Sequence, residues 1–148
     1  ETGIDRSNTV CATVGGTDPE GGFRTMYLTV DPDSSVPIAQ QIHDGIVAGI
    51  VSGELQDGQP LLSVRRLAVE YGVNPATVKK AYDQLQEDGL VHTAARSGTV
   101  ITRPKQPSVQ QRERLREDLR ATVRRALAQG FNVDDICATI DDLAVKWE

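Results

Sequence analysis

Apolar residues recur at helical spacing in three successive stretches of the central part of the chain. In the first stretch, isoleucines occupy every fourth position from Ile38 to Ile50, which predicts an amphipathic helix from about Pro37 to Ser52. Gly53 follows as a stop signal. The second stretch begins after Ser63 and the third after Asn74, and both residues are favourable N-caps.

The second and third stretches are short and separated by a tight turn. Val64, Leu67, Ala68 and Tyr71 form one apolar face, and Val78, Ala81, Tyr82 and Leu85 form the other. Gly72 ends the second predicted helix and Gly89 ends the third. Pro75 fits the first helical position, where its missing N–H costs nothing. Two helices so arranged predict a helix-turn-helix.

The outward side of the third helix favours a polyanionic partner. Ala76 and Thr77 are small enough for close approach, and Lys79 and Lys80 add positive charge one turn later. The helix N-terminus itself favours phosphate. The alternative is an ordinary helix pair with a solvated basic face.

After Gly89 the pattern changes from helical to β-prone. Residues 90–94 and 99–102 are separated by a turn that contains Gly98, which predicts a hairpin. Three helices followed by such a hairpin make a winged helix-turn-helix, so the predicted fold is mainly α with a small β-hairpin wing. Arg96 at the hairpin tip could reach a minor groove or a phosphate, or remain a solvated loop arginine.

The leading residues show no helical or alternating period. Residues 1–25 are rich in Gly, Thr and Asp, and regular patterning begins after Met26. We therefore expect residues 1–25 to be a disordered extension outside the fold. Residues 27–30 could form a short edge strand at the start of a DNA-binding domain over residues 26–104.

Residues 105–148 form a separate tail. Pro104 and Pro107 indicate a linker, and two amphipathic helices are predicted on either side of Gly130. Their apolar faces must pack on the winged domain or on a second copy of the chain, and we favour a homodimer. The expected dimerisation residues are Leu115, Leu119, Val123, Leu127, Val133, Ile136, Ile140, Leu143 and Trp147. Four arginines at four-residue spacing, from Arg112 to Arg124, form either a solvated stripe or a DNA-backbone contact.

Composition adds limits to this picture. The net charge of −5 argues against nucleic acid at first sight, but residues 1–35 contribute −4 of it. No segment is apolar enough for a membrane span or a secretion signal, so we expect a cytoplasmic protein. Cys11 and Cys137 are isolated and expected to be reduced. His43 and His92 lack partners at metal-ligand spacing, so no metal or cofactor is expected.

Residues 37–91, together with Gly98-Thr99-Val100, resemble the GntR family of bacterial transcription regulators. The Val-Asn-Pro-Ala-Thr-Val form of the third helix and the short two-helix tail are similar to the YtrA-like branch. The resemblance implies a guanine contact for Arg65, phosphate contact for Thr77, backbone contact for Lys79 and a wing glycine at Gly98. It also implies a dimerising tail, often with control of transporter operons.

The residues and the resemblance together define a candidate DNA-binding set. Its members are Ser63, Arg65, Arg66, Asn74, Ala76, Thr77, Lys79, Lys80, Arg96, Ser97, Gly98 and Thr99. The chain departs from the family pattern at three positions. Leu62 stands where proline is usual in the family, Arg66 where an acid is common, and Pro75 where arginine is frequent.

The sequence thus predicts a homodimeric, sequence-specific repressor that binds double-stranded DNA at an inverted-repeat operator, with an unknown effector. The alternative is a winged-helix adaptor that binds protein and not DNA. An enzyme is disfavoured, because no grouping of serine, cysteine, histidine and carboxylate residues converges on a catalytic site.

Overall fold

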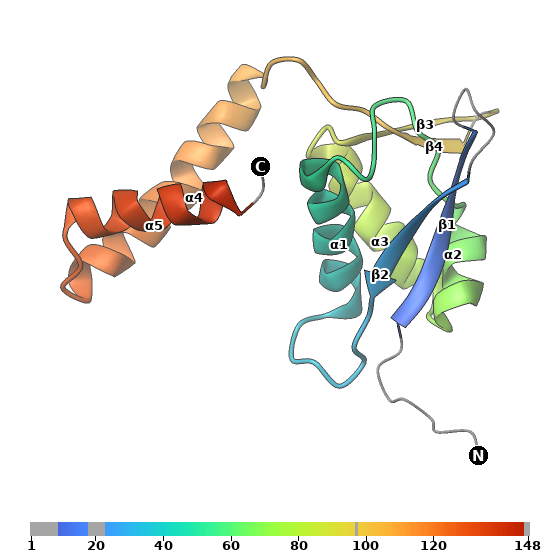
Figure 1. Cartoon of the computed structure of the whole chain (residues 1–148), viewed down its shortest axis with the longest axis horizontal. Helices are drawn as coiled ribbons and strands as arrows, with labels where there is room; N and C mark the ends of the chain where they lie inside the picture. Colours follow the sequence, from blue (N-terminus) through green and yellow to red (C-terminus); the bar gives the residue numbers. More distant parts are fainter. Residues whose placement is uncertain (1–8, 18–22, 97, 147–148) are drawn as a thin grey trace. The chain divides into compact units, whose positions relative to one another are not determined.

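The computed structural model describes residues 9–17, 23–96 and 98–146, which belong to two compact units. The first unit spans residues 1–104 and the second residues 105–148. Figure 1 shows both units and labels their helices and strands. The three central helices, the hairpin after them and the mainly helical content confirm the predicted winged helix-turn-helix.

Capping residues and glycines mark most ends of the three central helices. Helix α1 covers Ile38–Ser52, α2 covers Val64–Tyr71 and α3 covers Pro75–Glu87. Gly53 and Gly72 follow α1 and α2 in the left-handed conformation that glycine adopts without strain. Because these signals are local, the sequence alone locates all three helices.

The apolar faces of these helices form one core. Its members are Leu28, Val30, Ala39, Ile42, Ile46, Ile50, Leu55, Leu62, Leu67, Ala68, Tyr71, Val78, Ala81, Tyr82, Leu85, Val91 and Ile101. The two tyrosines keep their hydroxyls hydrogen-bonded, since Tyr71 donates to the Leu28 carbonyl and Tyr82 to the Leu62 carbonyl. The core is therefore apolar without leaving these buried hydroxyls unpaired.

The wing is an antiparallel hairpin of β3, Val91–Ala94, and β4, Gly98–Ile101. Strand β4 also exchanges backbone hydrogen bonds with the segment before α2: Leu61 N–H donates to the Thr99 carbonyl and Ile101 N–H to the Gln59 carbonyl, each over 2.8 Å. The wing is thus tied to the start of the helix-turn-helix.

The prediction that residues 1–25 are a disordered extension is wrong for much of that segment. Strand β1, Thr9–Thr17, pairs antiparallel with β2, Phe23–Thr29, and Cys11 lies opposite Tyr27. Figure 1 shows this hairpin beside α1 and α2. The two strands form backbone hydrogen bonds with each other, and Leu28 in β2 and Val30 just after it belong to the core.

The second unit consists of α4, Val109–Ala128, and α5, Val133–Val145. Ser108 and Asn132 each form a capping box with the third residue of the following helix, which defines both starts. Neither helix buries any of its residues. No helix in the described ranges has the length and apolar character needed to cross a membrane.

Candidate nucleic-acid interface

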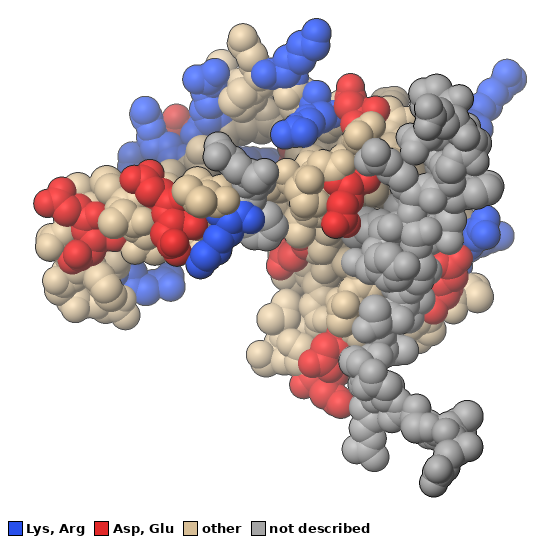
Figure 2. All heavy atoms as spheres, viewed as in Figure 1, with Lys and Arg blue, Asp and Glu red and all other residues tan. Residues whose placement is uncertain are grey.

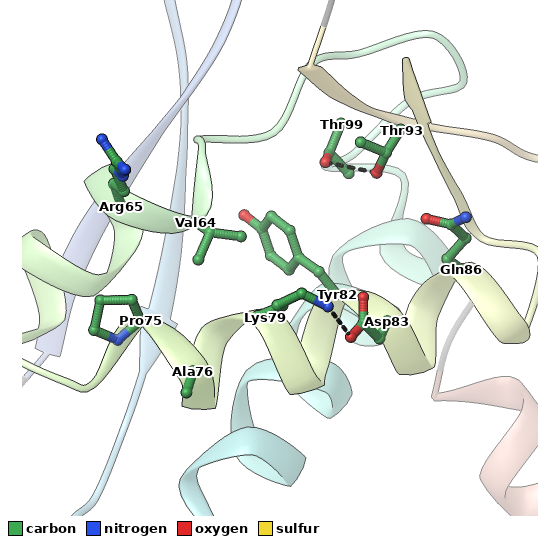
Figure 3. A pocket seen from close by; sticks show the side chains of 10 residues that line it. All are labelled: Val64, Arg65, Pro75, Ala76, Lys79, Tyr82, Asp83, Gln86, Thr93 and Thr99. Atoms are coloured by element: carbon green, nitrogen blue, oxygen red, sulfur yellow. Dashed lines mark hydrogen bonds and ion pairs between the residues drawn. The ribbon is translucent and has the colours of Figure 1, made fainter. Parts of the chain in front are cut away.

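A groove of about 540 Å³ lies where the start of α2, the outer face of α3 and the wing approach one another. Figure 3 shows the side chains that line it. They are Val64, Arg65, Pro75, Ala76, Lys79, Tyr82, Asp83, Gln86, Thr93 and Thr99. The groove therefore brings together four residues of the predicted DNA-binding set: Arg65, Ala76, Lys79 and Thr99.

The start of α3 is fixed by its cap. The Asn74 side chain accepts a hydrogen bond from the Ala76 N–H over 2.8 Å, and Pro75 occupies the first turn. Ala76 itself is exposed. A capped first turn with a small exposed side chain leaves the backbone open to close approach by a large ligand.

The position of Arg65 in the groove depends on the fold of the segment that precedes α2. The Ser63 hydroxyl accepts from the Arg66 N–H and caps α2. One residue earlier, the Leu62 carbonyl accepts from the Tyr82 hydroxyl over 2.7 Å. Burial raises the pKa of Tyr82, and the neighbouring Tyr71 adds to this, so the phenol remains a donor. This bond links the position of Arg65 to α3.

Lys79 is exposed but not unpartnered. Its Nζ lies 2.6 Å from Oδ2 of Asp83, one turn further along α3, and Figure 3 shows this ion pair on the groove side of the helix. The two side chains are 67% and 57% exposed. Lys79 is therefore accessible to a ligand that enters the groove.

The wing supplies a polar wall. Oγ1 of Thr93 and Oγ1 of Thr99 are 3.0 Å apart and hydrogen-bonded, and Thr99 is only 8% exposed. Thr99 thus shapes the groove through its contact with Thr93.

The remaining residues of the predicted set lie outside the lining of this groove. Ser63 and Asn74 act as caps, Arg66 lies 3.6 Å from Glu70, and Thr77 is half-buried. Arg96 is exposed in the turn of the wing, and Gly98 begins β4 with a positive φ of 71°. Ser97 lies outside the described residues.

Lys80 lies on a different side of α3 from Lys79. It lines a cavity of about 100 Å³ together with Pro37, Ala39, Gln40, His43, Ala81 and Gln84. The two lysines, adjacent in sequence, therefore face different surroundings.

His43 connects α1 to the end of α3. Its Nε2 lies 2.8 Å from Asp88 and its Nδ1 lies 2.9 Å from Asp44, while the side chain is 14% exposed. Burial is the largest single influence and lowers the pKa, but the hydrogen bonds and charges of both carboxylates outweigh it and raise the pKa above 6.5. His43 is a packed, ion-paired histidine.

Among the described residues, no group of histidine, cysteine and acidic side chains is arranged to hold a metal ion. The groove also contains Asp83, Gln86 and Thr93, which are not in the set predicted from the sequence. A usable signal exists for Asp83, since it follows Ala76 by seven residues and Lys79 by four and so shares their helix face.

Comparison with known proteins places this geometry in a family. Residues 38–101 match the model of the bacterial regulatory proteins of the gntR family. The HTH-type transcriptional repressor YtrA of Bacillus subtilis is 39% identical over 75 residues, which are 51% of this chain and 58% of that repressor. The chain thus covers less than two thirds of this relative.

Two solved structures share both sequence and fold with the chain. A transcriptional antiterminator from Listeria monocytogenes is 33% identical with a TM-score of 0.69, over 78% of this chain and 88% of that one. YtrA from Sulfolobus acidocaldarius, a GntR-family transcription factor, is 36% identical with a TM-score of 0.58. This match covers 68% of this chain and 97% of that one. The chain belongs to the GntR family of bacterial regulatory proteins.

Proposed function

We propose that the protein is a sequence-specific, DNA-binding transcriptional repressor that acts as a homodimer on an inverted-repeat operator. The observation that carries this proposal is the groove that is lined by Arg65 from the start of α2 and by Ala76 and Lys79 from the first turns of α3. This role in bacterial transcription would place the protein in the cytoplasm.

The two cations suit different parts of a duplex. A guanidinium fork can donate two hydrogen bonds to O6 and N7 of guanine in the major groove, so Arg65 is the base-reading candidate. An ammonium group is a point charge and fits a phosphate, so Lys79 is the backbone-binding candidate. Arg96 on the wing turn is exposed and can extend the contact to a phosphate or a minor groove.

The caps of α2 and α3 support the proposal in a different way. Asn74 and Pro75 hold the first turn in place before any ligand arrives, so little ordering is needed on binding. Ser63 does the same for the helix that carries Arg65. A preformed surface of this kind favours specific recognition.

The second unit supports a homodimer. Apolar side chains of α4, α5 and the turn between them are 42–83% exposed: Val109, Leu115, Leu119, Leu127, Phe131, Val133, Ile140, Leu143 and Val145. Val123 and Ile136 are half-buried, and Trp147 lies outside the described residues. A second copy would cover these faces, and a two-fold pair would direct both α3 helices to half-sites of an inverted repeat.

Charge on the second unit is segregated between its helices. Figure 2 shows arginine side chains over α4 and aspartate side chains over α5. In α4 there are six arginines against three acids, and in α5 four aspartates and no base. Two copies can therefore offer opposite charges to each other, which supports self-association over association with a uniformly charged partner.

Selection of bound sequences from a random pool of double-stranded DNA tests the proposal. We expect enrichment of an inverted repeat with half-sites about one or two helical turns apart. Enrichment of a single half-site would contradict the proposed dimer but not the proposed DNA binding. Retention of no sequence at low salt would contradict DNA binding and would favour the adaptor.

A further inference from the structure

We propose that Asp83 is a specificity-determining residue, whose carboxylate accepts a hydrogen bond from the exocyclic amino group of a cytosine in the bound DNA; the inference rests on the proposed function. It concerns a carboxylate in the middle of a surface that is otherwise suited to a polyanion.

Asp83 shares one helix face with the residues that approach DNA. Ala76, Lys79 and Asp83 are spaced three and then four residues apart, and all three line the groove. Seven residues of helix span about 10 Å, which is less than the width of the major groove. A helix that inserts its first turns there therefore carries Asp83 to the base edges or close to them.

The carboxylate is available for a new hydrogen bond. Its Oδ2 accepts from Lys79, whereas Oδ1 has no hydrogen-bond partner among the described residues. The side chain is 57% exposed and so is not held by the core. An ionised carboxylate only accepts hydrogen bonds, and cytosine N4 is a donor in the major groove.

The ion pair with Lys79 explains how an acid is tolerated at a DNA-facing surface. Lys79 neutralises the carboxylate as long as no phosphate is near. An exposed pair at i,i+4 spacing is weak, so Lys79 can move to a phosphate when DNA binds. The carboxylate then faces the duplex uncompensated, and only a DNA site that offers a donor restores its partner. Asp83 thereby penalises wrong sequences as well as favouring the right one.

The experiment compares base preferences of the full chain and of Asp83→Ala by selection from a random DNA pool. For the variant we expect the preference for cytosine at one position of each half-site to fall about five- to tenfold, with other positions unchanged. We also expect affinity for unrelated DNA to rise, because a negative charge near phosphate has been removed.

Glu87→Ala is the matched control. Glu87 is exposed at the end of the same helix and does not line the groove, and the substitution removes the same charge. We expect it to leave the cytosine preference unchanged. If both substitutions change base preference equally, the effect is general electrostatics and the inference is wrong.

The Lys79→Ala background separates direct reading from an effect through Lys79. If the contact is direct, Lys79→Ala keeps the cytosine preference, and adding Asp83→Ala to it reduces that preference. If the preference is already absent in Lys79→Ala, Asp83 only positions the lysine and the inference fails. Failure of the unsubstituted protein to select any sequence would refute the proposed function itself, whereas normal selection that is insensitive to Asp83→Ala would refute this inference alone.

Discussion

Arg65 and Lys79 carry the same charge but cannot replace each other. The planar guanidinium of Arg65 offers a rigid pair of donors at the edge of the groove, whereas the ammonium of Lys79 is a compact charge on a flexible stem, paired with Asp83 in the free protein. The proposed function therefore assigns sequence discrimination to one residue and general attraction to the other.

Arg65→Ala should reduce affinity for the selected operator by about 1 to 3 kcal/mol and relax specificity at one base pair of each half-site. The loss follows from removal of a bidentate guanine contact. Quantitative binding to the operator and to single-base variants of it measures both effects.

Lys79→Ala serves as the comparison. It should weaken binding to the operator and to unrelated DNA alike, and should lower the slope of log affinity against log salt by about 1, because one phosphate contact is lost. The assignment of roles would be contradicted by two variants that change specific and unspecific binding in the same way.

His43 provides a pH-dependent contribution to folding. Its pKa in the folded protein lies above 6.5 because Asp44 and Asp88 together outweigh the effect of burial, and Lys80 lines the same small cavity. The folded state therefore binds the proton more tightly than the unfolded chain does. The resulting stabilisation is fully present below pH 6.5 and is lost as the pH rises through the folded pKa.

The expected result is a free energy of unfolding that decreases from about pH 6 to about pH 8, measured by denaturant titration. In His43→Gln this decrease should be smaller, since the titrating group is gone. An equal decrease in both proteins would assign the pH dependence to other groups.

At the scale of elements, the contact between α1 and β2 depends on a glycine. Gly45 lies in the middle of α1, and a Cβ there would overlap the side chain of Leu28, which is buried in the core. Glycine costs about 1 kcal/mol in a helix interior relative to alanine, so its use here is explained by the close approach of β2.

Gly45→Ala should destabilise the first unit by about 1 to 2 kcal/mol, because overpacking against Leu28 exceeds the gain in helix propensity. Thermal or denaturant unfolding measures the change. In a Leu28→Ala background the same substitution should be neutral or stabilising, since the overlap is removed. Destabilisation of equal size in both backgrounds would contradict the contact as the cause.

At the scale of the whole molecule, the proposed assembly rests on the second unit. Helices α4 and α5 have well-formed caps and no buried residue, so their formation is locally specified while their apolar faces still lack cover. In the proposed dimer, a second copy provides that cover.

Leu119→Asp should shift the protein from dimer to monomer and reduce affinity for an inverted-repeat operator by at least about tenfold, because a charge would be buried in the interface. Sedimentation at two protein concentrations measures the association. Ala121→Asp introduces the same charge at another exposed position of α4 and should leave the dimer intact. A monomer at all concentrations for the unsubstituted chain would contradict the dimer.

The sequence by itself determined the helices, the wing and the likeness to the GntR family. Caps such as Ser63 and Asn74, stops such as Gly72, and apolar periods act over a few residues, so they can be recognised without a fold. Strand β1 does not stand out in this way although Val10 and Val14 lie at alternating positions, because Gly and Thr dominate the surrounding composition.

The tertiary structure decided which of the candidate residues share a surface. Only the fold places Lys80 in a cavity with His43 of α1, buries Thr99 in the wing and brings Arg65 of α2 to the same groove as Asp83 of α3. The surroundings of Lys80 and of Arg65 join positions that lie far apart along the chain. They depend on how helices and strands pack, which short-range patterns of apolar and polar residues do not specify.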